Sequence, residues 1–96
     1  MYGLIGRMRA VEGKRDELAG ILAGIDDMPG CLSYIVALED SDPQAIWVAE
    51  VWDSAEAHAA SLSLPSVQAA IEKGRPLIAE FDQRIETEPI GGIGVP

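Results

Sequence analysis

The segment AIWVAEVWDSAEAHAASLSLPSV, residues 45–67, reads as a buried strand followed directly by a helix, and it carries both tryptophans and the single histidine. Successive side chains of a strand point to opposite faces. One face of this strand holds Ile46, Val48, Glu50 and Trp52, and the other holds Trp47, Ala49 and Val51. Both faces are mostly apolar, whereas a sheet with one face in water carries polar residues on that face. Besides the helices, a second layer must therefore cover this strand.

The size and charge of the chain narrow the possible classes of protein. Its 96 residues form one domain, and a chain this short buries only about 60–65% of its unfolded surface, so association with another copy adds burial. The 16 Asp and Glu residues outnumber the 7 Lys and Arg residues, which argues against a nucleic-acid partner because such a partner requires a basic surface. We see neither a signal peptide nor an apolar run of roughly 20 residues, and we expect a cytoplasmic protein.

The chain has one cysteine and one histidine, too few for an internal disulfide or a metal site built from these residues. Cys31 is the only cysteine, so no disulfide forms within the chain, and we expect a small core residue there. No spacing of His, Cys and Asp residues predicts a metal site.

The first half of the chain alternates between strand and helix patterns. Residues 2–11 are rich in strand formers and end at Glu12-Gly13, which breaks the strand before a helix. From Lys14 onward, apolar residues follow the spacing of one helical face until Pro29-Gly30 ends the helix. That face comprises Leu18, Ile21, Leu22, Ile25 and Met28. Residues 31–38 form a second strand, and a polar turn joins it to the strand at 45–52 as a hairpin.

The second half of the chain predicts two helices and a last strand. Asp53 suits the N-cap of the first helix, because Glu56 three residues later completes a capping box, and this helix extends to about residue 62. A proline separates it from a second helix, which Ser66 can cap. Pro76 interrupts the second helix because it lacks an amide donor. The apolar face of that helix comprises Val67, Ala70, Ile71, Leu77, Ile78 and Phe81. Residues 81–87 alternate as expected for an edge strand.

The resulting order, β-α-β-β-α-α-β, is the α+β ferredoxin-like plan, in which helices cover one face of a four-stranded antiparallel sheet. The other face then exposes apolar side chains, and such a patch marks an interface or a ligand groove. Back-to-back pairing of two sheets in a homodimer is the simplest way to cover it. We expect the domain to span residues 1–88. The Gly- and Pro-rich tail at 89–96 is either disordered or laid against the partner subunit.

Three patterns carry a family resemblance: V-x-G-K at residues 11–14, PGCLSY at 29–34 and EVWxSxEAH at 50–58. Together they resemble the antibiotic biosynthesis monooxygenase domain, of the quinol monooxygenase type, in the dimeric α+β barrel superfamily. The resemblance covers nearly the whole chain, to about residue 86. It implies a homodimer with a pocket between sheet and helices in each subunit. It also implies oxidation of an electron-rich aromatic or quinol by O₂ without metal, flavin or haem, in which the deprotonated substrate gives an electron to oxygen.

The resemblance transfers to individual residues only in part. Trp52 stands at the family's tryptophan at the strand end, which implies a role in the pocket. The family's usual helix histidine falls at Ser61, and His58 lies one helical turn earlier, pointing roughly the same way as Ser61 and Leu62. His58 is either its substitute, acting as general base, or a surface residue. A haem-degrading subgroup has an asparagine at the position of Gly6. This chain lacks both that asparagine and the usual helix histidine, which argues against haem degradation.

Four further residues have both a functional and a structural interpretation. Tyr34 can donate a hydrogen bond to a substrate oxygen or fill the dimer interface. Glu50 either meets a cation or serves as a carboxylate in the pocket, because charged side chains are rarely buried unpaired. Arg84, like Arg7, can hold a phenolate oxygen or pair with the abundant acids. Trp47, on the other face of its strand, is expected in the core on the helix side.

These patterns support a leading function and one alternative. The leading hypothesis is a cofactor-independent monooxygenase that acts on a quinol, phenolic or polycyclic aromatic substrate. In it, His58 is the base, Trp52 lines the pocket, and Tyr34 and Arg84 orient the oxygenated ring. The alternative is a non-catalytic or isomerase-type α+β barrel that binds a small apolar ligand, and the missing helix histidine favours it.

Overall fold

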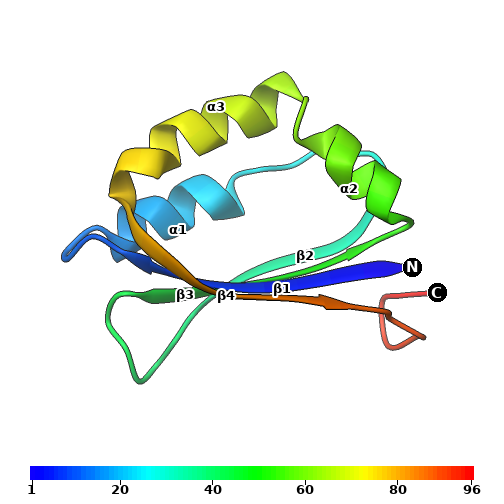
Figure 1. Ribbon diagram of the computed structural model, residues 1–96, viewed down its shortest axis with the longest axis horizontal. Helices are drawn as coiled ribbons and strands as arrows, with labels where there is room; N and C mark the ends of the chain where they lie inside the picture. The colour runs from blue at the N-terminus through cyan, green and yellow to red at the C-terminus, as the bar shows by residue number, and fades with distance from the viewer.

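Four antiparallel strands form one sheet, and all of the helices lie on one of its faces (Figure 1). The computed structural model describes residues 1–96. The strands are β1 (Tyr2–Ala10), β2 (Cys31–Leu38), β3 (Ala45–Trp52) and β4 (Ile78–Thr87), in the spatial order β2-β3-β1-β4. The helices are α1 (Arg15–Ala23), α2 (Ala55–Ser61) and α3 (Pro65–Gly74), followed by a 3-10 turn, η1 (Arg75–Leu77). The α+β ferredoxin-like prediction is confirmed, and no helix is long and apolar enough to cross a membrane.

The two central predictions of strand boundaries, 31–38 and 45–52, are confirmed, but α1 is shorter than predicted. It ends at Ala23 with Gly24 as C-cap, whose amide donates to the carbonyl of Gly20 at 3.1 Å. Gly24 keeps a right-handed helical backbone with φ −81°, and two glycines in the last turn, Gly20 and Gly24, weaken the helix because glycine has a low helix propensity. Ile25 and Met28, predicted on the helical face, therefore lie in the loop before β2.

The predicted caps of the other two helices are wrong by one or two positions. Ser54, not Asp53, is the N-cap of α2, and its Oγ accepts a hydrogen bond from the amide of Ala57 at 3.1 Å. Helix α3 begins at Pro65, before Ser66, with Leu64 at the N-cap. Proline suits the first helical position because its missing amide has no helical partner there.

The end of α3 also differs from the prediction. Pro76 falls in η1, and the chain then enters β4 at Ile78, so Ile78 and Phe81 belong to a strand and not to a helical face. They pair with Ala10 and Met8 of β1, respectively. Backbone pairing with a central strand thus extends β4 in the N-terminal direction.

The core lies between sheet and helices and contains Met8, Ala10, Leu18, Ile46 and Val48. Trp47 lies on the opposite, uncovered face of the sheet, so its assignment to the helix-side core is wrong. Its indole donates to Glu39 at 2.7 Å, and the guanidinium of Arg7 lies 5.9 Å from its ring centroid. Alternation separates the two faces of a strand, but it does not say which of two apolar faces the helices cover.

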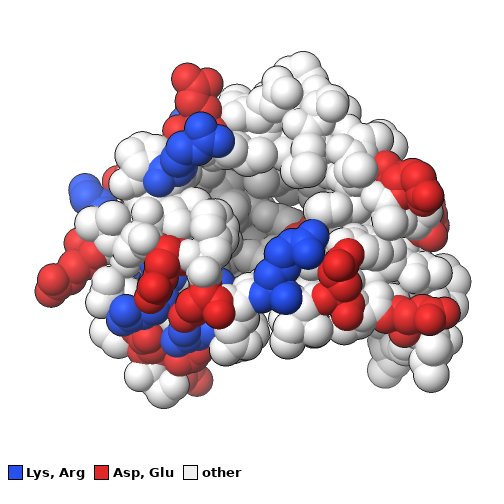
Figure 2. Space-filling model, in the orientation of Figure 1, with Lys and Arg blue, Asp and Glu red and all other residues white.

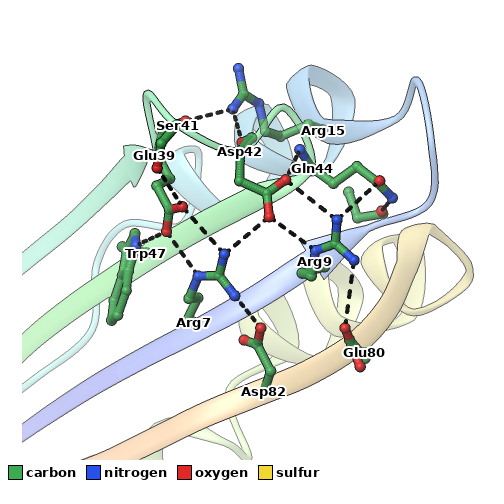
Figure 3. A network of polar contacts seen from close by, with 11 residues as sticks. Arg7, Arg9, Arg15, Glu39, Ser41, Asp42, Gln44, Trp47, Glu80 and Asp82 are labelled. Carbon is green, nitrogen blue, oxygen red and sulfur yellow. Dashed lines mark hydrogen bonds and ion pairs between the residues drawn. The ribbon is translucent and has the colours of Figure 1, made fainter.

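Arg7 is the centre of a polar network on the uncovered face (Figure 3). It pairs with Glu39 at 2.9 Å, with Asp42 at 3.1 Å and with Asp82 of β4. Arg9 also reaches Asp42, at 3.2 Å. The hydrogen bond from Arg7 holds the pKa of Glu39 down at about 2. Arg7 therefore has the structural role, and it joins β1 to the β2–β3 turn and to β4.

The tail at residues 88–96 turns back on itself through an isolated bridge between Gly92 and Val95. Pro89 lies beside Gly3 at the start of β1. Ile90 and Ile93 are fully exposed, so neither side chain contributes to the core.

Candidate active site

A cavity of about 260 Å³ lies on the helix-covered face of the sheet, and we call it the head chamber. Figure 2 shows the hollow between the helices and the sheet, walled largely by uncharged residues with a basic side chain at its lower edge. All four strands and α1 contribute to it. The lining includes Leu4, Gly6 and Met8 from β1, Leu22 from α1, Tyr34 from β2, Val48 and Glu50 from β3, and Phe81 and Arg84 from β4.

The strand register brings the polar residues of the head chamber together. Tyr34 is paired with Glu50, and Glu50 is paired with Leu4. In the next row on the same face, Gly6 lies between Val48 and Arg84. Gly6 carries no side chain, and this absence leaves space at the floor of the chamber.

Glu50 is the one carboxylate that lines the head chamber, and Trp52 holds it. The indole Nε1 of Trp52 donates a hydrogen bond to Oε1 of Glu50 at 2.9 Å. Trp52 is only 1% exposed, so its ring cannot move freely. This hydrogen bond uses Oε1 of Glu50, and Oε2 takes no part in it. A half-buried carboxylate fixed in this way can accept a proton from a ligand.

Tyr34 lies on the chamber side of the sheet, not on the uncovered face. Its hydroxyl donates a hydrogen bond to the carbonyl of Leu22 at 3.0 Å. Burial raises the pKa of Tyr34 to about 12, and the charge of Glu50 adds to the effect. The Tyr34 hydroxyl therefore stays protonated, and its proton is already committed, so that only its oxygen lone pairs are available to a ligand.

Two arginines line the head chamber, and Arg84 is the one that is not held by several carboxylates, because Arg7 is paired in the polar network described above. Arg84 lies in edge strand β4, its side chain is 60% exposed, and its nearest carboxylate contact is Glu86 at 3.6 Å. A pair this loose and this exposed holds the guanidinium weakly. Arg84 is therefore free to move onto an anionic oxygen in the chamber.

Neither His58 nor Trp52 lines the head chamber; His58 packs against Trp52, and Trp52 reaches the chamber only through its hydrogen bond to Glu50. The ring centroid of His58 lies 5.4 Å from that of Trp52, edge-on, and 5.5 Å from that of Tyr2. The Tyr2 hydroxyl donates to Glu86 at 2.7 Å, and this bond raises the pKa of Tyr2. The His58 imidazole thus packs against the tryptophan that holds Glu50.

The last two predicted site residues lie apart from the head chamber. Ser61 is the buried last residue of α2, and its hydroxyl donates to the carbonyl of His58 at 2.6 Å. It borders a separate hollow with Gly30 and Ala57. Leu62 is 49% exposed at the end of α2. Of the predicted residues, the structure brings together Tyr34, Glu50, Trp52 and Arg84.

No group of three or more His, Cys, Asp or Glu side chains is arranged to hold a metal ion. Cys31 is half-buried at the start of β2, and burial raises the pKa of its thiol.

Comparison with known proteins adds the family. A model of the family described as "Antibiotic biosynthesis monooxygenase" matches residues 1–73. The chain belongs to this family. None of the curated proteins matches the chain.

Two solved structures that carry the same family name are similar to this monooxygenase-family chain. A protein from Chloroflexus aurantiacus J-10-fl is 62% identical, with a TM-score of 0.95, over 99% of this chain and 98% of the other. A protein from Deinococcus radiodurans is 26% identical, with a TM-score of 0.79, over 97% and 96% of the two chains. A third, from Nitrosomonas europaea, is 15% identical with a TM-score of 0.81 and supports the fold alone.

Two residues that line the head chamber, Gly6 and Phe81, were not predicted as site residues. Phe81 was predicted both at the end of a helical face and at the start of the edge strand, and its role in the wall depends on the pairing of β4 with Met8. Gly6 appeared only as the position at which a haem-degrading subgroup has asparagine. One signal was available, because Gly6 stands between Leu4 and Met8 on the apolar face of its strand.

Proposed function

We propose that this protein is a cofactor-independent monooxygenase that oxidises a quinol, a phenol or a polycyclic aromatic substrate with O₂ in the cytoplasm. The family membership supports the reaction class. The observation that carries the proposal is the head chamber, where Glu50, Tyr34 and Arg84 converge from three strands on a space of about 260 Å³. This volume is slightly below the usual range of ligand pockets, about 300–1,000 Å³, and suits a single aromatic ring.

The proposed reaction balances without an added reductant. A phenol and one O₂ give a quinone and one water: one oxygen atom replaces a hydrogen on the ring, the other leaves as water, and the substrate supplies all of the electrons. The first requirement is loss of the phenolic proton, because the anion gives up an electron to O₂ more readily than the neutral phenol. The protein contributes a base, a cation near the phenolate oxygen and exclusion of water.

We assign these roles to residues of the chamber. Glu50 accepts the phenolic proton, and Trp52 keeps its carboxylate in place through the 2.9 Å hydrogen bond. Arg84 stabilises the phenolate oxygen. Tyr34, whose proton is bonded to Leu22, borders the ring. His58, the base expected from the sequence, acts in this proposal as a positioning residue behind Trp52, since their ring centroids are 5.4 Å apart.

Oxygen consumption tests the proposal. The protein is incubated in chelator-treated buffer with a panel of quinols and hydroxylated aromatics, and O₂ uptake is compared among wild type, Glu50→Gln, Arg84→Gln, Trp52→Phe and His58→Ala. We expect Glu50→Gln to lower kcat by about 10²–10⁴-fold, which is the usual contribution of a general base. Glu72→Gln, an exposed change on α3, is the matched control. If no substrate drives protein-dependent uptake, the monooxygenase proposal fails; if His58→Ala loses as much as Glu50→Gln, the base assignment fails.

The competing function is a non-catalytic or isomerase-type barrel that binds a small apolar ligand. The position of His58 outside the chamber favours it, because no imidazole is then available there for proton transfer. Quenching of tryptophan fluorescence by an aromatic ligand, without any O₂ uptake, is the result that this alternative predicts.

We further propose that the protein works as a homodimer through the uncovered face of the sheet. One row of paired residues crosses all four strands on that face: Ile35, Ala49, Ile5 and Ile85. The three isoleucines are 58%, 36% and 49% exposed. A continuous apolar row of this kind favours burial against a second copy. Light scattering tests the proposal: wild type should have the mass of a dimer at micromolar concentration and Ile5→Asp that of a monomer, and a monomeric wild type would contradict it.

A further inference from the structure

A second, larger cavity of about 390 Å³ lies next to the head chamber, and we call it the tail chamber. It lies between α1, α3 and the start of β4, and nine of its twelve lining residues are hydrophobic. Its apolar walls include Leu18, Leu22, Ile25, Ala70, Ile71 and Ile78. The other three lining residues are Gly74, Arg75 and Glu80. Arg75 and Glu80 are exposed, and Glu80 pairs with Arg9 at 3.7 Å, so neither brings an unpaired buried charge to the tail chamber.

The two chambers share part of their walls. Met8, Leu22 and Phe81 line both of them. These three side chains are apolar, and methionine adapts its shape more easily than branched residues do. Phe81 is 72% exposed, so little packing holds its ring in place. Met8 is buried in the core, so Phe81 is the part of the boundary that can move, and its displacement lets one ligand extend from the first chamber into the second.

The chemistry of the two chambers differs. The head chamber is lined by the carboxylate of Glu50 and by two arginines, of which Arg84 is free of the polar network, whereas the tail chamber has an apolar interior with charges only at its exposed rim. We propose that the tail chamber binds an aliphatic chain attached to the aromatic ring of the substrate, so that the preferred ligand is a phenol or quinol with an alkyl or prenyl substituent. This inference rests on the proposed function, which places the aromatic ring of the substrate in the head chamber.

A series of 4-alkylphenols with methyl, propyl and pentyl substituents tests the inference. Dissociation constants are measured by tryptophan fluorescence under nitrogen, so that binding is separated from oxidation. Burial of each methylene contributes about fourfold in affinity, and we expect the dissociation constant to fall by about that factor per added methylene. A change of less than twofold across the series overturns the inference.

Two variants distinguish the tail chamber from nonspecific binding of apolar chains. Ile71 lines the tail chamber and is 40% exposed, so Ile71→Trp can fill the space without disrupting the core. Ala69 is exposed on the same helix and lines only a different hollow, so Ala69→Trp is the matched control. We expect Ile71→Trp to lose the affinity gained from longer chains and Ala69→Trp to keep it. Equal dependence on chain length in both variants overturns the inference, and circular dichroism checks that both are folded.

The design separates failure of this inference from failure of the proposed function. Binding of 4-methylphenol without any gain from longer chains overturns the tail chamber and leaves the monooxygenase proposal standing. Binding of 1-pentanol but not of 4-methylphenol, with the pentanol site lost in Ile71→Trp, supports the tail chamber and contradicts an aromatic ring in the head chamber. No binding of any compound overturns both.

Discussion

The hydrogen bond between Trp52 and Glu50 makes a quantitative prediction about stability. Trp52→Phe removes the indole donor that lies 2.9 Å from the Glu50 carboxylate. A hydrogen bond to a charged group contributes about 1.5–3 kcal/mol. Because Trp52 is only 1% exposed, the smaller ring also leaves a void that costs on the order of 1 kcal/mol. We expect the free energy of unfolding to fall by about 2.5–4 kcal/mol.

A double-mutant cycle isolates the bond from the void. Glu50→Gln keeps an oxygen acceptor but removes its charge, and a bond between neutral groups contributes about 0.5–1.5 kcal/mol. Trp52→Phe should therefore cost less in the Glu50→Gln background than in wild type. The expected coupling energy between the two changes is about 1 kcal/mol.

Urea denaturation of the four proteins at pH 7 measures this coupling, at one fixed protein concentration so that any oligomerisation affects all of them alike. Trp47→Phe is the matched control, because Trp47 also donates to a carboxylate, Glu39 at 2.7 Å, but on the other face of the sheet. Its coupling with Glu50→Gln should be zero within about 0.3–0.5 kcal/mol. A Trp52–Glu50 coupling no larger than this control would refute the view that Trp52 holds the Glu50 carboxylate.

Three further predictions concern the chamber, the polar network and a helix cap. Gly6→Val should weaken binding of 4-methylphenol at least tenfold, because the new side chain fills the floor of the head chamber. Circular dichroism should not change, because a Cβ at Gly6 meets the Gln83 carbonyl at an ordinary 3.7 Å. Unchanged affinity would mean that Gly6 is not at the floor. The Glu39 pKa is lowered from 4.5 to about 2 on folding, so its stabilisation is complete above pH 4.5 and is lost as the pH falls toward 2. Urea midpoints between pH 6 and 2 should therefore depend less on pH in Arg7→Gln than in wild type, and parallel curves would contradict this role. Ser54→Ala should lower the free energy of unfolding by about 1 kcal/mol, and Asp53→Ala should cost clearly less; the reverse order would restore Asp53 as the cap.

The order of the elements was predictable because it depends on local patterns. Residues 31–38 and 45–52 were predicted as strands with the bounds that the structure has, since each is a continuous run of strand formers between turn residues. The boundaries that were wrong, at α1 and β4, depend on competition between neighbouring structures. Ile78 was predicted on a helical face, and Phe81 fitted both that face and the strand alternation; pairing with β1 placed both of them in β4.

The sequence by itself determined the α+β plan, the family and the residues that share one face of each strand. Only the tertiary structure decided that Trp52 and Glu50 lie under the helices while Trp47 faces away from them. Both faces of β3 are apolar, and the alternation of side chains does not indicate which face the helices cover. The tertiary structure also decided that Tyr34, Glu50 and Arg84 meet, since they lie on three strands whose neighbours are set by hydrogen bonds across the sheet. Local patterns depend on residues a few positions apart, whereas a binding site depends on strand order and register between residues far apart in the chain.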